Sequence, residues 1–338
     1  MKDLCIMSAL YCGILPMKST LKLNLNTFLI SVFVLLSSLS AIAEDKSGIM
    51  DNYQSTKIAE HSWVVFGPKA VPNPENKGFM NNPAFLITDK NVIVIDPGSS
   101  LQVGNALLEK IREQTDKPIS HVFISHVHGD HWLANHAIYE AYPEVKIYAH
   151  PVMIEEAIAG KAESWIANMK TLTEGATEGT KAIIPTIALE DSQEYKIDNI
   201  TIKAHLNEIA HTKTDAMFEI LEDKVLITGD NSFNERMPRL DDGSFTGNIK
   251  AMDKALSLNI DVVVPGHGPA GGKEILNNFR NFLSIIYDNS KMMMNEDMDP
   301  FEMKPIIVAK MGEFQSWSSF DDNIGKLISL AALEAENE

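Results

Sequence analysis

The sequence predicts an α/β protein with a mainly helical C-terminal part. Short apolar runs typical of buried strands alternate with segments of helical spacing as far as residue 270. Histidine and aspartate residues directly follow several of these runs, and the ends of strands are where α/β proteins usually build their sites. From Lys273 onward the spacing is helical, with a break at Asp299-Pro300. The 338 residues could form one large domain or two small ones.

The first predicted elements are mostly strands. Short strands are expected on either side of a loop rich in Pro, Asn and Gly, Val71–Asn82, and a fully apolar run ends in the turn Asp96-Pro97-Gly98. The predicted strands are 58–66, 84–88, 92–95 and 122–125, and the predicted helices are 103–114 and one that starts at Trp132.

The second half of the chain continues the alternation. The run 216–221 and the run 225–227 are separated by Glu222-Asp223-Lys224, which predicts a hairpin. Helices are expected at 155–172 and 249–257, and strands at 195–206, with a turn at Asp198-Asn199, and at 262–264. The final helix, about Phe320–Glu336, has an apolar stripe and Ser319 as a candidate N-cap. Its simplest role is packing on the core.

The N-terminal residues have the pattern of a signal peptide. Lys18 and Lys22 precede the apolar run Phe28–Leu36, and the small residues of Ala41-Ile42-Ala43 follow. Cleavage after Ala43 would make residues 1–43 the leader, with either Met1 or Met17 as the start. We therefore expect a periplasmic or secreted protein without stable membrane insertion after cleavage, although an uncleaved anchor is the alternative.

Charge and cysteine content restrict the chemistry. The formal net charge is −17, which disfavours a nucleic-acid partner because phosphate binding needs a basic surface. Cys5 and Cys12 are the only cysteines, and both lie in the predicted leader. A mature chain would therefore have no cysteine nucleophile or ligand, so a metal site would need histidine and carboxylate groups.

The most informative segment is Ser125-His126-Val127-His128-Gly129-Asp130-His131, directly after an apolar run. Histidine is the usual nitrogen ligand of zinc, and three histidines lie within this predicted strand-to-helix loop. A helix N-terminus capped by Asp130 with solvated histidines would explain one His and one Asp. It explains three histidines poorly.

Three further candidate ligands follow apolar strands later in the chain. His211 follows Ile209-Ala210, Asp230 ends a run that starts at Val225, and His267 lies in Pro265-Gly266-His267-Gly268. One such residue is usually a loop or capping group. Three of them can converge with the first cluster at one sheet edge, and together they supply the roughly seven ligands that two divalent ions need.

These four motifs, in this order, resemble those of the metallo-β-lactamase superfamily, over about Trp63 to Pro269. The resemblance implies an αββα sandwich with metals at one edge of two sheets. It implies that residues 44–270 form this domain and 271–338 a helical extension packed on it. It further implies that one metal is held by His126, His128 and His211, and a second by Asp130, His131 and His267, with Asp230 bridging both. Asp96 matches a family aspartate expected to orient the ligand loop.

The expected cofactor is a pair of Zn²⁺ ions, with iron or manganese possible. A metal-bridging hydroxide would attack a carbonyl of a small-molecule substrate, and Asp130 would orient it as the catalytic carboxylate. Asp230 favours hydrolysis of a thioester, ester or lactone, since glyoxalase II-like and lactonase-like members have Asp there. Export favours a β-lactamase. A mono-iron persulfide dioxygenase-like oxidoreductase is the alternative from another reaction class, whereas a non-catalytic module would lack a ligand. The exact substrate and the oligomeric state stay open.

Other polar and sulfur-containing residues have simpler interpretations. We expect the remaining histidines to be structural or solvated, namely His61, His121, His136, His150 and His205. The methionine-rich patch around Met292–Met294 is interpreted as adaptable packing. Arg236 and Arg239 lie near the predicted site, where an arginine could bind a substrate carboxylate, or could pair with Asp241 or Asp242, which we slightly favour.

Overall fold

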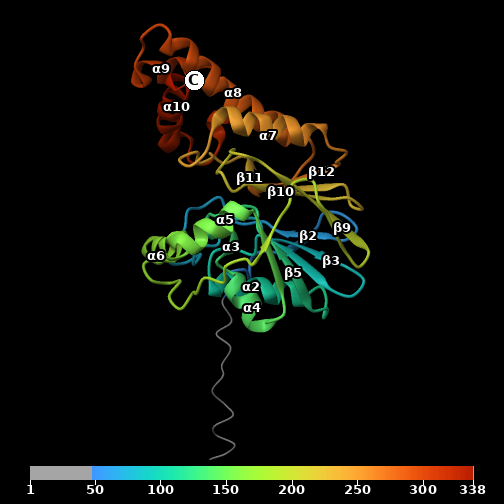
Figure 1. Ribbon diagram of the computed structural model, residues 1–338. Coiled ribbons are helices and arrows are strands. Elements are labelled where there is room, and N and C mark those ends of the chain that lie inside the picture. Colours follow the sequence, from blue (N-terminus) through green and yellow to red (C-terminus); the bar gives the residue numbers. More distant parts are fainter. Residues whose placement is uncertain (1–47, 338) are drawn as a thin grey trace, which may run out of the picture. The chain divides into compact units, whose positions relative to one another are not determined.

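The computed structural model describes residues 48–337, and in them two β-sheets pack face to face between two layers of helices (Figure 1). The predicted αββα sandwich with a helical C-terminal part is therefore confirmed. The predicted leader, residues 1–43, lies outside the described residues.

The first sheet leads into the histidine cluster, which follows its strand β5. Its strands lie in the order β1-β2-β3-β4-β5-β6-β7. The first four pair antiparallel, and β4 to β7 pair parallel. The bounds are β1 (Ser55–Lys57), β2 (Ser62–Val65), β3 (Ala84–Ile87), β4 (Val92–Ile95), β5 (Ile119–Phe123), β6 (Lys146–Ala149) and β7 (Ile187–Ala188).

The second sheet carries the later candidate ligands. Its order is β12-β11-β10-β9-β8, with β11 and β12 parallel and the other pairs antiparallel. The bounds are β8 (Glu194–Ile197), β9 (Ile200–Leu206), β10 (Ala216–Ile220), β11 (Val225–Phe233) and β12 (Val262–His267).

Helices cover the outer face of each sheet. Figure 1 shows α2 to α6 outside the first sheet and α7 to α10 outside the second. On the first side lie α2 (Leu101–Arg112), α3 (Gly129–Trp132), α4 (Asn135–Ala141), α5 (Pro151–Glu156), the π-helical turn η1 (Ala157–Lys161) and α6 (Ala162–Leu172). On the second lie α7 (Phe245–Ser257), α8 (Glu274–Met294), α9 (Pro300–Val308), the 3₁₀ turn η2 (Gly312–Ser316) and α10 (Phe320–Glu336).

Three apolar layers hold the sandwich together. One fills the space between the sheets, and the other two lie between each sheet and its helices. Strand β4 shows why the central strands are continuously apolar: Ile93 and Ile95 face the other sheet, whereas Val92 and Val94 face the helices. Burial on both faces requires an apolar run rather than an alternating pattern.

Several predicted boundaries differ from the structure. The strand expected at 58–66 is shorter, because only β2 (Ser62–Val65) lies in that range, and β2 pairs antiparallel with β1, which ends at Lys57. The helix expected at 155–172 is interrupted at Gly160, whose φ of 116° is incompatible with a regular helix. The strand expected at 225–227 continues to Phe233, so Asp230 lies inside β11 at an irregular pairing with β12 and does not close the strand.

The final helix has the predicted bounds but not the predicted cap. Ser319 has a left-handed φ of 65°, and its side chain accepts no capping hydrogen bond. The helix does pack on the core as expected, through residues such as Ile324, Leu327 and Ile328. It also contacts the segment between β11 and α7, which the sequence did not predict.

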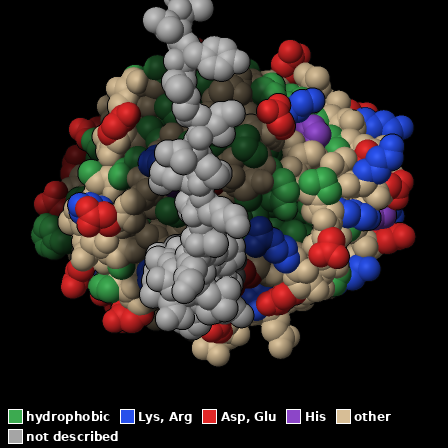
Figure 2. All heavy atoms as spheres, turned by 90° about the horizontal axis from the view of Figure 1, so that it is seen from below, with side chains coloured by type: hydrophobic (Ala, Val, Ile, Leu, Met, Phe, Trp, Pro, Cys, Tyr) green, Lys and Arg blue, Asp and Glu red, His purple; other side chains and the backbone are tan. Residues whose placement is uncertain are grey.

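On the face drawn in Figure 2, the Lys and Arg side chains that can be seen lie among Asp and Glu side chains. No helix within residues 48–337 has both the length and the apolar character that a membrane span requires.

Candidate metal centre

The predicted ligands converge at one edge of the two sheets. His126 and His128 follow β5, and Asp130 and His131 lie in the first turn of α3. His211 lies in the connection from β9 to β10, whereas Asp230 lies in β11 and His267 ends β12. The structure therefore brings all seven sequence-predicted site residues together.

Four of these side chains form a first group. One ligand atom from each of His126, His128, His211 and Asp230 lies within 4.8 Å of the others. His128 Nδ1 is 2.9 Å from His211 Nε2, and His211 Nε2 is 3.4 Å from Asp230 Oδ2. His126 Nε2 is 3.9 Å from the same Asp230 oxygen.

The second group contains Asp130, His131 and His267. Asp130 Oδ2 is 3.5 Å from His131 Nε2 and 3.3 Å from His267 Nε2. The other oxygen of Asp230, Oδ1, is 3.1 Å from His131 Nε2 and 3.3 Å from His267 Nε2. Asp230 thus presents one oxygen to each group, which is the arrangement that a bridging carboxylate needs.

Asp96 orients two of the histidines through the ring nitrogens that point away from the site, one directly and one through Ser125. Its Oδ2 lies 2.8 Å from His131 Nδ1 and accepts a 2.6 Å hydrogen bond from Ser125 Oγ. Ser125 Oγ is also 2.9 Å from His126 Nδ1, and the Ser125 backbone N–H donates to Asp96 Oδ1 at 2.8 Å. If both Nδ1 atoms carry the proton, both Nε2 atoms face the site unprotonated. Asp96 therefore occupies the orienting position expected of it.

Two more histidines are held by other groups. His267 Nδ1 lies 2.8 Å from both the Met80 carbonyl oxygen and Arg236 Nη1, so it donates to the first or accepts from the second, and Nε2 faces the site. His128 is held in the opposite sense, because its Nε2 lies 3.3 Å from Asp242 Oδ2 and its Nδ1 faces His211. Outer hydrogen bonds of this kind fix the tautomer and the ring orientation of a histidine ligand.

Burial and neighbouring charges determine the protonation of the site. Burial, together with the nearby His131, holds the pKa of His126 well below its usual range, and burial lowers the pKa of His211 to about 3. Burial opposes ionisation of Asp230, but His267 and His131 outweigh it and hold the Asp230 pKa well below its usual range. Burial lowers the pKa of the other two rings, but Asp230 and Asp130 outweigh it at His131, whose pKa lies well above its usual range, and Asp230 outweighs it at His267, whose pKa is raised. A cation bound here would displace the protons of these two rings, because histidine binds a metal ion as the neutral imidazole.

The donor set fits divalent metal ions. His126 Nε2, His131 Nε2 and Asp230 Oδ1 are buried and have no hydrogen-bond partner, an expensive arrangement unless another group satisfies them. Nitrogen and oxygen donors without sulfur suit zinc, manganese or iron. The residues present can therefore hold metal ions, and their number and identity remain predictions.

A pocket of about 120 Å³ opens onto both groups. Its polar side contains Asp130, Asp230, Arg236 and Asp242. Its apolar side is formed by Pro72, Met80, Trp165, Met169, Leu172, Phe233 and Met237. A molecule bound there would contact the candidate ligands, a buried guanidinium and an apolar wall at the same time.

The other histidines contact groups outside the site, as expected, and the two arginines after β11 differ from each other. None of the other histidines among the described residues belongs to either group. They have partners elsewhere, such as Asp223 at 2.9 Å from His61 Nδ1 and Glu219 at 2.8 Å from His205 Nε2. The expected ion pair forms at Arg239, whose Nε is 3.4 Å from Asp241 Oδ2. Arg236 is buried instead, with Nη1 2.8 Å from His267 Nδ1.

Sequence reasoning missed three contributors to the site. Ser125 stands next to His126, but nothing in its residue type indicates that it links Asp96 to that ring. Met80 contributes only its backbone carbonyl, which carries no sequence signal. The sequence suggests Asp242 only as the ion-pair partner of an arginine, because its contact with His128 depends on the path of the chain after β11.

The fold and the site define an αββα protein with clustered histidine and aspartate groups that could hold metal ions at the edge of its sheets. Residues 78–267 match the metallo-beta-lactamase superfamily, and the chain belongs to that superfamily.

Its relatives include proteins named as hydrolases. The chain is 23% identical over 260 residues to a linear primary-alkylsulfatase of a Pseudomonas species, across 63% of this chain and 47% of the alkylsulfatase. It is 26% identical over 199 residues to a probable metallo-hydrolase of Streptococcus pyogenes serotype M6, across 56% of this chain and 79% of the relative. The match thus spans less than half of the alkylsulfatase.

Solved structures share the fold. A metallo-beta-lactamase from Pontibacter korlensis matches with a TM-score of 0.54 at 16% identity, covering 69% of this chain and 99% of that one. The stereoselective inverting sec-alkylsulfatase Pisa1 from a Pseudomonas species matches with a TM-score of 0.58 at 18% identity, covering 75% of this chain and 45% of that one.

Proposed function

We propose that the protein is an exported hydrolase that uses two zinc ions to cleave a thioester, an ester or a lactone. The observation that carries this proposal is the position of Asp230, whose two carboxylate oxygens each face one of the two ligand groups. The presence of a second complete group of ligands favours two metal ions over one. Iron and manganese are compatible with the same donors.

In this proposal His126, His128, His211 and Asp230 would hold one ion, and Asp130, His131, His267 and Asp230 the other. Two bound divalent ions supply Lewis acidity, which lowers the pKa of water and polarises the bond to be cleaved. The residues of the chain then position the substrate and move the proton.

Asp130 is the proposed catalytic carboxylate. It lines the pocket and is nearly buried, and although burial opposes its ionisation, His131 and His267 hold its pKa well below the usual range. An ionised carboxylate at this place can accept a hydrogen bond from the attacking water and orient it toward the substrate. Water adds to the acyl carbon, the carbon–sulfur or carbon–oxygen bond breaks, and the proton passes to the leaving group.

A sulfate ester is the second candidate substrate, and Arg236 favours it. Its guanidinium is buried in the pocket wall beside His267, and no Asp or Glu among residues 48–337 forms an ion pair with it. A guanidinium matches the planar geometry of an anionic oxygen pair, and the apolar wall suits an alkyl chain. The similarity to proteins named as alkylsulfatases supports the same candidate.

Export is supported by the sequence alone. The basic residues, the apolar run and Ala41-Ile42-Ala43 have the order of a cleavable leader. We propose that the mature chain starts at Glu44 and acts in the periplasm or outside the cell. The mass of the exported protein tests this, because a chain that retains Phe28–Leu36 would indicate an anchor instead.

Metal content and a substrate panel test the activity. Residues 44–338 would be purified without added metal and analysed by elemental mass spectrometry. They would then be assayed with an acyl thioester, a lactone, a β-lactam and n-octyl sulfate. We expect about two zinc ions per chain and turnover of the thioester or lactone. Turnover of n-octyl sulfate alone would establish the second candidate.

Two outcomes would contradict the proposal. About one iron per chain and oxygen-dependent turnover of a persulfide would indicate the dioxygenase alternative. Turnover of the β-lactam alone would indicate a β-lactamase. Asp230→Ala tests the bridging carboxylate directly: we expect loss of activity and of at least part of one metal equivalent in a folded protein. A variant that retained both metals and the full rate would refute the bridging role.

A further inference from the structure

The segment from Asn234 to Ser244, here called the pocket loop, connects β11 to α7 and carries much of the pocket wall. Arg236, Arg239 and Asp242 of this loop line the pocket, and Asp242 also contacts the ring of His128. The position of the loop therefore determines which side chains a bound substrate would contact and how the His128 ring is oriented.

The C-terminal segment contacts the pocket loop at three successive points. At the start of the loop, Ser318 N–H donates to the Glu235 carbonyl at 3.0 Å, and Met237 N–H donates to the Ser318 carbonyl at 3.1 Å. In the middle, Lys326 of α10 forms an ion pair with Asp241. At the end, Glu334 reaches the first residues of α7.

The contact at Glu334 is the strongest of the three. Its carboxylate accepts hydrogen bonds from the backbone N–H of Phe245 at 2.7 Å and of Thr246 at 3.0 Å. The hydroxyls of Ser244 and Thr246 also donate to it, both at 2.8 Å. These N–H groups begin a helix and have no partner within it, and a carboxylate there is favoured by the helix dipole. By contrast, the Lys326 side chain is 51% exposed, and an exposed ion pair contributes little.

The start of α7 transmits this contact to the candidate ligands. Ser244 N–H donates to the Ala210 carbonyl at 2.8 Å, directly before His211. A Cβ atom on Gly243 would lie 2.4 Å from the Ala210 carbonyl oxygen and 2.6 Å from that of His211, so the loop runs against the His211 backbone. Asp242 comes just before this close approach and lies 3.3 Å from His128 Nε2. A shift at the start of α7 would therefore move Asp242 relative to His128.

We propose that Glu334 is a positioning residue of the active site, and that α10 holds the pocket loop in the conformation that binds substrate. The final helix thus has a role beyond packing on the core. Glu334 touches neither group of candidate ligands, and it acts through the start of α7 on Asp242 and on the pocket wall. The catalytic part of this inference rests on the proposed hydrolase function, whereas the effect on the loop does not.

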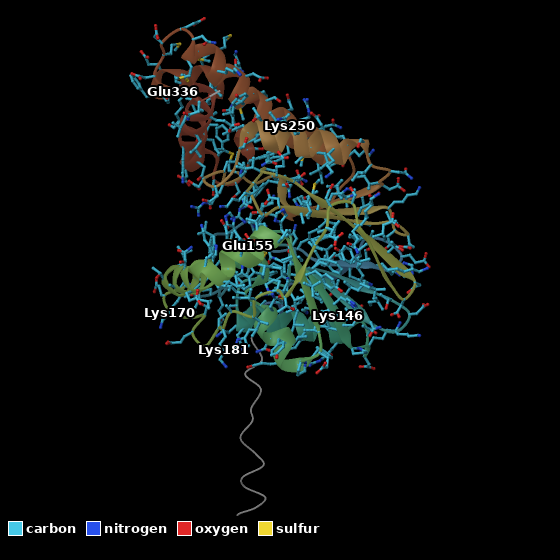
Figure 3. The ribbon with its side chains drawn as sticks, viewed as in Figure 1. Lys146, Glu155, Lys170, Lys181, Lys250 and Glu336 are labelled. Atoms are coloured by element: carbon cyan, nitrogen blue, oxygen red, sulfur yellow. The ribbon has the colours of Figure 1, made fainter. Side chains whose placement is uncertain are left out.

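Hydrogen exchange of residues 44–338 tests the effect on the loop without substrate or metal. The variant Glu334→Gln keeps the shape but loses the charge and places an amide N–H₂ toward backbone N–H donors. We expect the amides of residues 242–247 to exchange at least about 10-fold faster than in the wild-type protein, while those of β11 are unchanged. The matched control is Glu336→Gln, an exposed glutamate at the end of the same helix (Figure 3).

Kinetics with whichever substrate of the panel is turned over test the effect on catalysis. We expect Glu334→Gln to raise KM about 3- to 10-fold, with kcat within about 2-fold, and Glu336→Gln to match the wild-type protein. Faster exchange throughout the chain, or exchange and KM equal to those of Glu336→Gln, would overturn the proposal and leave Glu334 as a stability contact. If no substrate is turned over, the proposed function fails, and local exchange still decides the role of Glu334 in the loop.

Discussion

Replacing Asp96 by asparagine should weaken metal binding by removing an acceptor that two histidines share. In the wild-type protein Asp96 Oδ2 faces His131 Nδ1 at 2.8 Å and Ser125 Oγ at 2.6 Å, while Oδ1 accepts from Ser125 N–H. An asparagine has one acceptor oxygen and one N–H₂ group. If its oxygen faces Ser125 N–H, its N–H₂ faces His131 Nδ1. That ring can then be satisfied only by moving its proton to Nε2, the atom that faces the site.

The size of the effect follows from this exchange of donor and acceptor. Loss of an outer partner of a histidine ligand typically costs about 10- to 100-fold in metal affinity. In free energy this is roughly 1.4 to 2.7 kcal/mol, which is comparable to leaving one buried polar group without a partner. We expect the affinity of the group containing His131 to fall by this amount, while the group containing His211 loses less.

Competition with a chromophoric chelator would measure both affinities, and nitrogen NMR of the imidazoles would report the His131 tautomer. Asp116→Asn, at an exposed position in the turn before β5, is the control for loss of one negative charge. Wild-type affinity for both metals in Asp96→Asn, with His131 still protonated at Nδ1, would refute the reasoning.

Three further predictions test the pocket, the sheet edge and the pH response. Arg236→Gln should raise KM for an anionic substrate about 30-fold, roughly 2 kcal/mol, and leave a neutral substrate unaffected; equal effects on both would exclude a direct contact. Gly266→Ala would place a Cβ atom 2.0 Å from Asp230 Oδ1 and 2.8 Å from the Gly229 carbonyl carbon. We therefore expect thermal unfolding to show that the free energy of unfolding falls by about 3 kcal/mol, and we expect the metal content to fall. Gly325→Ala is the control, because a Cβ atom there has no close neighbour to displace. Burial, with Lys146, lowers the pKa of His121 to about 4. The unfolded chain takes up this proton near pH 6.5, whereas the folded chain does so only near pH 4, so acid favours unfolding. As the pH falls from 7 to 4.5, the free energy of unfolding of the wild-type protein should fall by about 1 kcal/mol more than that of His121→Gln, after allowance for solvent screening. A difference between the two proteins that does not change with pH would contradict this assignment.

The sequence predicted the local parts of the site well because their signals are local. Three histidines and an aspartate within Ser125–His131 follow a buried strand, and a strand end places them at the sheet edge whatever the rest of the chain does. One prediction failed because a strand boundary depended on a partner: β11 continues beyond Ile227 because β12 pairs with it as far as Phe233. The helix expected at 155–172 failed for a local reason, because Gly160 adopts a positive φ that a regular helix excludes.

The fold class and the residue types available to a metal ion could be read from the order of the residues, as could the position of most candidate ligands just after predicted strands. Those features follow from apolar periodicity and from the chemistry of single side chains. Three contacts became visible only in the folded chain. Asp230 presents one carboxylate oxygen to each ligand group, and Ser125 Oγ lies between Asp96 and the His126 ring. The Glu334 carboxylate accepts hydrogen bonds from the first N–H groups of α7. These contacts join residues through space and through backbone atoms, and a linear pattern of residue types carries no record of either.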